Sequence, residues 1–139
     1  MEEVAQALAD AVDRALPDWV TAAVRSRVAG PVPEATADAA QRARAEIVPR
    51  LRDLLATDVD QQRSNPLAIL REAVRYPAEV LREAGVEPPD RDDFERERFP
   101  DDVYGLVPAN FADFGPEVAE AGIAWGAAKA WTHRRRHET

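Results

Sequence analysis

The chain has 139 residues, with 26 acidic against 18 basic residues and a formal net charge of −8. This length predicts a single domain. The acidic balance argues against a general nucleic-acid binder, because phosphate contacts need a positively charged face. The sequence holds no cysteine, which excludes disulfides, thiolate nucleophiles and cysteine-based zinc sites. Its 27 alanines favour closely packed helices.

No apolar run in the sequence approaches the length that a membrane-spanning helix needs. The first residues, Met1 to Val4, are acidic where a signal peptide would be basic, and no apolar stretch follows them. We therefore expect a cytoplasmic protein.

Residues 2–29 are predicted to be helical, because apolar side chains recur every four residues. The stripe consists of Val4, Leu8, Val12, Leu16, Val20, Val24 and Val28. Pro17 interrupts the pattern, and the residue before a proline avoids the helical region. One kinked helix and two helices broken near Leu16 both satisfy this pattern. Gly30 to Pro33 then end the helical segment.

Two further helices are predicted, over residues 34–63 and 66–84. Pro49 is expected to kink the first, and Pro77 to divide the second. Asn65 before Pro66 indicates an N-cap followed by proline at the first helical position. Gly85 indicates a C-terminal cap.

Residues 86–115, which we call the strap, change character. With Pro116 they hold five prolines, and they also hold Phe94, Phe99, Tyr104, Phe111 and Phe114. A disordered linker would be poor in aromatic residues. We therefore expect loops and short helical turns that are fixed to the body by mostly buried rings.

The last helix is predicted over residues 116–136, with Val118, Gly122, Trp125 and Lys129 on one face. Gly122 and Gly126 would allow a close internal helix crossing. No segment alternates with period two for more than about four residues, so no sheet is expected. The predicted fold is an all-α, single-domain bundle of about five helices with an irregular aromatic and proline-rich strap.

The sequence offers few residues arranged in a pattern that catalysis uses. His133 and His137 have the i, i+4 spacing of metal ligands, but the three arginines between them would repel a cation. The carboxylates of residues 90–102 alternate with Arg91, Arg96 and Arg98, which indicates a solvated surface of ion pairs. We expect no metal and no cofactor, and the balance is against an enzyme.

The charge is distributed unevenly at the C-terminal end. Residues 129–139 carry four basic residues against Glu138, a net +3, after a stretch over 103–128 that has no base. Trp125 and Trp131 are six residues apart, about 240° around a helix. One tryptophan is therefore expected in the core and the other at the rim or at a partner contact. The candidate partner-binding residues are Lys129, Trp131, Arg134, Arg135 and Arg136.

Four segments resemble a group of small helical proteins of high-GC Gram-positive bacteria. They are residues 58–71 (DVDQQRSNPLAILR), 74–77 (VRYP), 99–106 (FPDDVYGL) and 125–130 (WGAAKA). The resemblance covers about residues 58–139. It implies a folded family and a bacterial, cytoplasmic setting, and it brings no activity, ligand or partner with it.

The sequence favours a non-catalytic interaction or regulatory module that binds another protein or its own copy. Two other hypotheses remain open. One is a membrane-surface or anionic-polymer binder that acts through the basic C-terminal end. The other is a carboxylate-based enzyme that uses the 90–102 cluster, which would need a desolvated Asp or Glu in a pocket.

Overall fold

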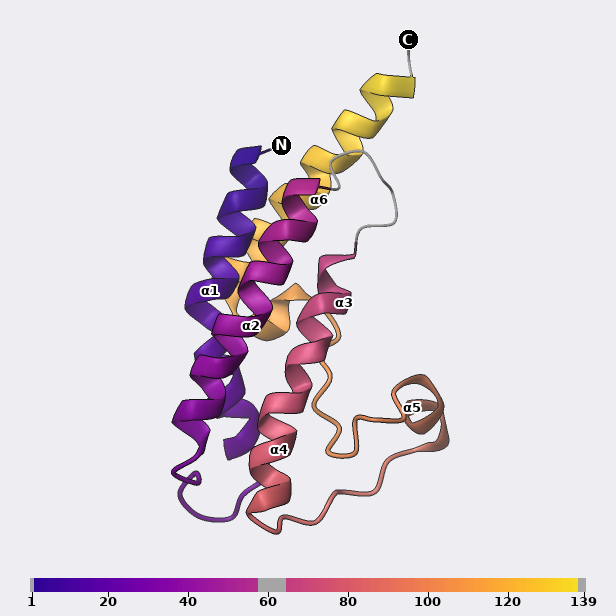
Figure 1. Ribbon diagram of the computed structural model, residues 1–139. Helices are drawn as coiled ribbons and strands as arrows, with labels where there is room; N and C mark the ends of the chain where they lie inside the picture. The colour runs from indigo at the N-terminus through magenta and orange to yellow at the C-terminus, as the bar shows by residue number, and fades with distance from the viewer. Residues whose placement is uncertain (1, 58–64, 138–139) are drawn as a thin grey trace.

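A computed structural model describes residues 2–57 and 65–137, and within these ranges it contains helices and no strands (Figure 1). The elements are α1 (Glu2–Arg25), α2 (Thr36–Thr57), α3 (Pro66–Arg71), the 3-10 turn η1 (Glu72–Val74), α4 (Arg75–Glu83), α5 (Asp93–Arg98), the 3-10 turn η2 (Phe111–Phe114) and α6 (Pro116–His137). Because α3, η1 and α4 are contiguous, they form one helical segment that bends at the 3-10 turn. The predicted all-α class with about five helical segments is confirmed. No helix among the described residues is both long and apolar enough to cross a bilayer.

The first predicted helix is one helix and not two, because α1 continues through Pro17. The four-residue stripe forms the centre of the core: Leu8, Val12, Leu16, Val20 and Val24 are all fully buried. The hydroxyl of Thr21 donates to the carbonyl oxygen of Pro17 at 3.1 Å, one turn earlier. Burial of the stripe on both sides of the proline keeps the two halves in one helix.

Helix α2 packs antiparallel to α1 (Figure 1). Its contact face combines Ile47 and Leu51 with small alanines, all of them buried. Ion pairs flank this interface: Arg44 donates to Asp13 at 2.7 and 3.1 Å, and Arg52 to Asp10 at 2.8 Å. The predicted extension of this helix to residue 63 lies outside the described residues.

The third predicted helix begins as expected but bends elsewhere. Asn65 caps α3 by accepting a hydrogen bond from the backbone N–H of Leu67 at 3.1 Å, with Pro66 at the first helical position. The prediction that Pro77 divides the helix is wrong, because the bend is the η1 turn. Pro77 lies in the first turn of α4, where a missing N–H is tolerated.

Gly85 ends α4 as predicted. Its φ of 75° lies in the left-handed region, which glycine adopts without a steric penalty. The N–H of Val86 donates to the carbonyl of Leu81 at 3.0 Å, and that of Gly85 to the carbonyl of Arg82 at 3.1 Å. This is the Schellman pattern of helix termination.

The strap is held to the body by some of its rings and not by others. Tyr104 and Phe114 are buried, and Phe99 and Phe111 are half-buried. The prediction for Phe94 is wrong, since its side chain is 68% exposed. It lies on α5, a six-residue helix without a buried residue, which stands away from the other helices (Figure 1).

Tyr104 fixes the middle of the strap. Its hydroxyl donates to the carbonyl of Val86 at 2.7 Å, and its own carbonyl accepts from Nε of Arg27 at 2.9 Å. Near the end of the strap the ring of Phe114 lies 5.2 Å from that of Trp19. Residues 86–115 therefore close onto α1, with α5 on an outer loop.

The two glycines of α6 have different surroundings. A Cβ at Gly122 would lie 2.5 and 2.7 Å from ring atoms of Phe111, whereas a Cβ at Gly126 would meet nothing within 4 Å. The predicted close internal contact therefore holds for Gly122 alone of the pair.

This contrast gives a first prediction. Gly122→Ala should destabilise the fold by about 1–3 kcal/mol, because the ring of Phe111 must move. Gly126→Ala should stabilise it by about 0.5–1 kcal/mol, the usual gain inside a helix. Urea unfolding of both variants measures the difference. Equal stabilisation by both would show that Phe111 does not pack against Gly122.

A second prediction concerns pH. Hydrogen bonds from Arg44 hold the pKa of the Asp13 carboxyl below its ordinary value of 3.8. This contribution to stability is present above that value and is lost as the pH falls through the lower, folded-state pKa. Arg44→Met should therefore raise the pKa of Asp13 in an NMR titration and lower stability at neutral pH by under about 1 kcal/mol, since the pair is partly exposed. Arg25→Met is the control and should leave the pKa of Asp13 unchanged.

Candidate functional site

Among the described elements, helix α6 packs mainly against α1 and η2. Val118 and Trp125 are buried on that side. The last turns of α6 run past the start of α1 and the end of α2 (Figure 1). The C-terminal part of α6 therefore presents side chains to solvent that no other described helix covers.

The two tryptophans of α6 differ as expected from their spacing. Trp125 is 9% exposed and Trp131 is 55% exposed. Each lies beneath a cation: Nζ of Lys129 is 5.0 Å from the Trp125 ring centre, and Cζ of Arg135 is 5.1 Å from that of Trp131. Cation–π contact orders both pairs.

The predicted partner-binding residues therefore do not all share one side of α6. Trp131, Arg134 and Arg135 are exposed. Lys129 is half-buried and lies against Trp125. The side chain of Arg136 lies outside the described part, as do those of His133 and His137.

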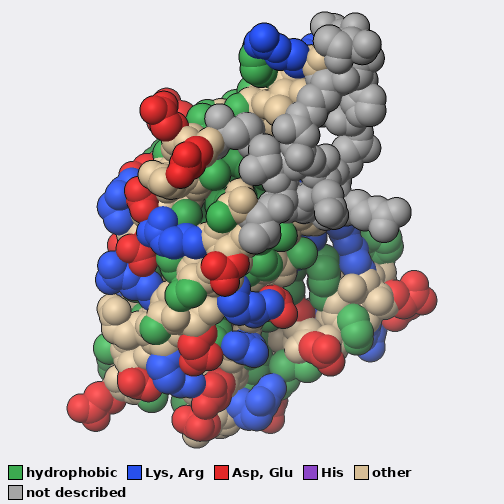
Figure 2. All heavy atoms as spheres, turned by 45° about the horizontal axis from the view of Figure 1, so that its top comes forward, with side chains coloured by type: hydrophobic (Ala, Val, Ile, Leu, Met, Phe, Trp, Pro, Cys, Tyr) green, Lys and Arg blue, Asp and Glu red, His purple; other side chains and the backbone are tan. Residues whose placement is uncertain are grey.

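The carboxylates of residues 90–102 are spread over α5 and its flanking loops. Most are exposed; Asp92 caps α5 by accepting from the N–H of Glu95 at 2.8 Å, and Asp93 pairs with Arg96 at 3.1 Å. Elsewhere on the surface, acidic and basic side chains are also intermingled (Figure 2). This is the solvated ion-pair surface that the sequence indicated.

Asp102 is the exception, with 8% exposure. Its two carboxylate oxygens accept from the backbone N–H groups of Leu106 at 2.8 Å and Val107 at 2.9 Å. A carboxylate used in this way fixes the turn that follows it. Its role in the structure is therefore to shape the strap.

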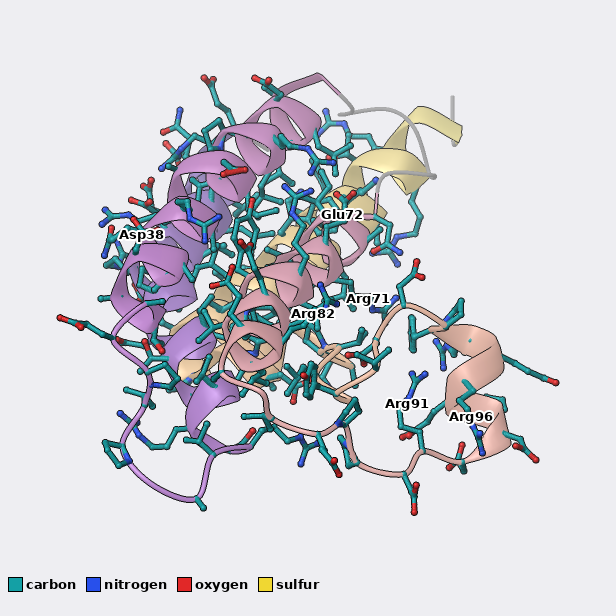
Figure 3. The ribbon with its side chains drawn as sticks, turned by 60° about the horizontal axis from the view of Figure 1, so that its bottom comes forward. Asp38, Arg71, Glu72, Arg82, Arg91 and Arg96 are labelled. Atoms are coloured by element: carbon teal, nitrogen blue, oxygen red, sulfur yellow. The ribbon has the colours of Figure 1, made fainter. Side chains whose placement is uncertain are left out.

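Two adjoining cavities, of about 320 and 400 Å³, lie between α3 and the strap. Arg71 and Arg91 lie in this region (Figure 3). Arg71 donates to the carbonyls of Pro108 and Ala109 at 3.1 and 3.3 Å, and Arg91 to that of Phe99 at 2.7 Å. The N–H groups of these arginines thus bind the strap, and acidic side chains line the same cavities.

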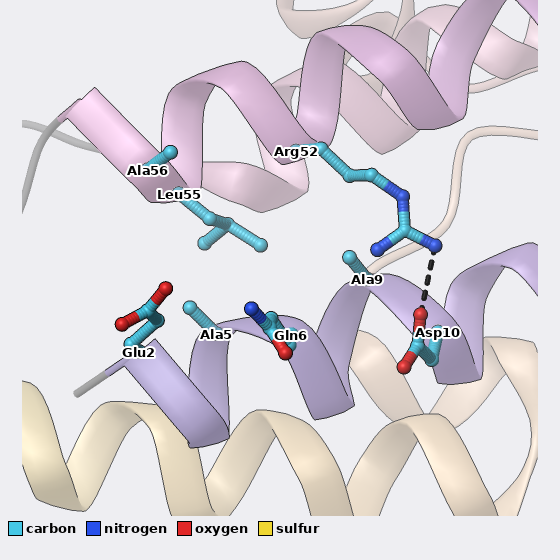
Figure 4. Close-up of a pocket in the computed structure, with 8 residues that line it drawn as sticks. All are labelled: Glu2, Ala5, Gln6, Ala9, Asp10, Arg52, Leu55 and Ala56. Carbon is cyan, nitrogen blue, oxygen red and sulfur yellow. Dashed lines mark hydrogen bonds and ion pairs between the residues drawn. The ribbon is translucent and has the colours of Figure 1, made fainter.

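A groove of about 430 Å³ between α1 and α2 was not foreseen from the sequence. Its apolar lining is Ala5, Ala9, Leu55 and Ala56, and its polar residues are Glu2, Gln6, Asp10 and Arg52 (Figure 4). Small residues at one-turn spacing near the helix end leave this hollow. That spacing is a local signal of the hollow, but it does not specify which residues lie opposite across the groove.

Among the described side chains, which do not include those of His133 and His137, no group of three or more His, Asp or Glu is arranged to hold a metal ion. Comparisons with protein-family models, with curated proteins and with solved structures found no match to this chain.

A third prediction tests the role of Asp102. Asp102→Ala should destabilise the protein by about 1–3 kcal/mol, because two backbone N–H groups lose their acceptor. Asp101→Ala, at the exposed neighbouring position, should change stability by less than about 0.5 kcal/mol. Thermal unfolding measures both. Wild-type stability of Asp102→Ala would mean that the carboxylate is not needed by the turn and would revive the enzyme hypothesis.

Proposed function

We propose that this protein is a non-catalytic interaction module that binds another macromolecule through the exposed side of the C-terminal part of α6. The supporting observation is Trp131, whose ring is 55% exposed on a helix end that projects beyond its neighbours. Tryptophan and arginine are the residues most enriched where protein partners contribute binding energy.

The neighbouring charges define the kind of partner. Arg134 and Arg135 are exposed beside Trp131, and the stacking of Arg135 on that ring restricts both side chains before binding. Side chains that are already restricted lose less conformational entropy when a partner binds, which favours association. The basic end of an otherwise acidic chain also attracts an acidic surface and speeds encounter. The proposed partner surface is therefore acidic, with an apolar site for one ring.

A membrane surface or an anionic polymer would use the same end of the helix. The exposed side of α6, however, also carries Glu120 in its first half. An interfacial helix on anionic lipid has basic residues along its polar face, and carboxylates there would be repelled. Glu120 therefore favours a protein partner.

The fourth prediction uses the wild type and two variants of this surface as immobilised baits in an extract of the source cells. Trp131→Ala and the double variant Arg134→Gln/Arg135→Gln should each lose a protein that the wild type retains, quantified by mass spectrometry. For the purified pair, the effect of the arginines should shrink between about 0.1 and 1 M salt, where the Debye length falls from about 10 to about 3 Å.

The matched control is Arg25→Gln/Arg82→Gln. These arginines lie in the last turns of α1 and α4, so the control removes the same charge from equivalent helix positions. It should retain the same proteins as the wild type. Equal loss with the control, or equal retention by all baits, would contradict the proposed function.

A further inference from the structure

The exposed side of α6 is an apolar face with opposite charges at its two ends. Ile123 is 74% exposed and Trp131 is 55% exposed. Ala124, Ala127 and Ala130 are exposed between them. At 100° per residue these five positions fall within about 120° of helix surface, opposite the buried Val118 and Trp125. Glu120 lies at the beginning of this face and Arg134 at its end.

The residues of this face are arranged symmetrically about Ala127, so that the face of a second, reversed copy would present apolar residues to apolar residues and opposite charges to each other. Glu120 and Arg134 are each seven residues from that centre, and Ile123 and Trp131 are each four residues from it. Ala124 and Ala130 are each three residues away. A two-fold axis through Ala127 would therefore place each residue opposite its counterpart in a second, antiparallel copy, as a closed two-fold interface requires.

We infer that α6 pairs antiparallel with α6 of a second copy of this chain, on a two-fold axis at Ala127. The inference rests on the proposed function and names the partner of that helix. Ile123 would contact Trp131 of the second copy, and the three alanines would allow the helices to approach closely. Glu120 would meet Arg134 of the second copy at both ends.

Charge selects this arrangement over a parallel one. A parallel pair would place Glu120 against Glu120 and Arg134 against Arg134, which is repulsive. Within the residues that the structure describes, Glu117 already pairs with Arg14, whereas Glu120 and Arg134 have no ion-pair partner. The two unpaired charges lie at the positions where antiparallel pairing brings opposite signs together.

The fifth prediction is measured by sedimentation equilibrium of the purified full chain at low salt. The wild type should form a dimer. Ile123→Asp should remain monomeric, because a carboxylate would face Trp131. Glu120→Arg and Arg134→Glu should each weaken the dimer about tenfold, since the two-fold axis doubles each change. The double variant Glu120→Arg/Arg134→Glu should restore wild-type association.

Phe94→Asp is the matched control, because Phe94 is 68% exposed, close to the 74% of Ile123, but lies on α5. It should dimerise like the wild type, and circular dichroism should show unchanged helicity in every variant. A dimer that is insensitive to Ile123→Asp, or a double variant that stays weak, would overturn antiparallel α6 pairing.

The outcomes separate this inference from the proposed function. A wild type that is monomeric at its highest soluble concentration overturns the second copy as partner. If that monomer still retains a Trp131-dependent protein, the interaction module stands with a different partner. If it instead sediments with vesicles of anionic lipid and retains no protein, both proposals fail together.

Discussion

Helix α1 carries an apolar side chain at every fourth position, and the rest of the fold depends on how that stripe is covered. A four-residue step advances about 40° beyond one helical turn. From Leu8 to Val24 the stripe therefore winds through about 160°, too far for one partner helix to bury it. Helices α2, α4 and α6 and the η2 turn all contact α1. Helix α6 covers part of the stripe with one face, and its other face stays exposed to solvent.

The sequence predicted correctly those features of the structure that depend only on residues close together in the chain. The stripe predicted α1, Asn65 with Pro66 predicted the start of α3, and Gly85 predicted the end of α4. Each of these depends on backbone geometry within one turn. The prediction for Pro77 is wrong because a proline breaks a helix or begins one according to its position, and that position depends on where η1 interrupts the helix.

Tertiary placement was predictable only where helical spacing fixes it. The six-residue separation assigned Trp125 and Trp131 to different sides of α6, and their burial agrees. For Phe94 the sequence offered only the density of aromatic residues, which does not reveal that α5 stands apart. The groove between α1 and α2 depends on which alanines face each other across two helices. Neither chain segment specifies that pairing alone.

The hydrogen bond from Tyr104 to the carbonyl of Val86 closes a loop across a separation of 18 residues, and α5 lies within it. None of the residues of α5 is buried. Doubling the length of a flexible loop costs only about 0.6 kcal/mol of closure entropy. The segment around α5 can therefore accept inserted residues, such as an epitope or a reporter domain, without disturbing the helices that α1 holds together.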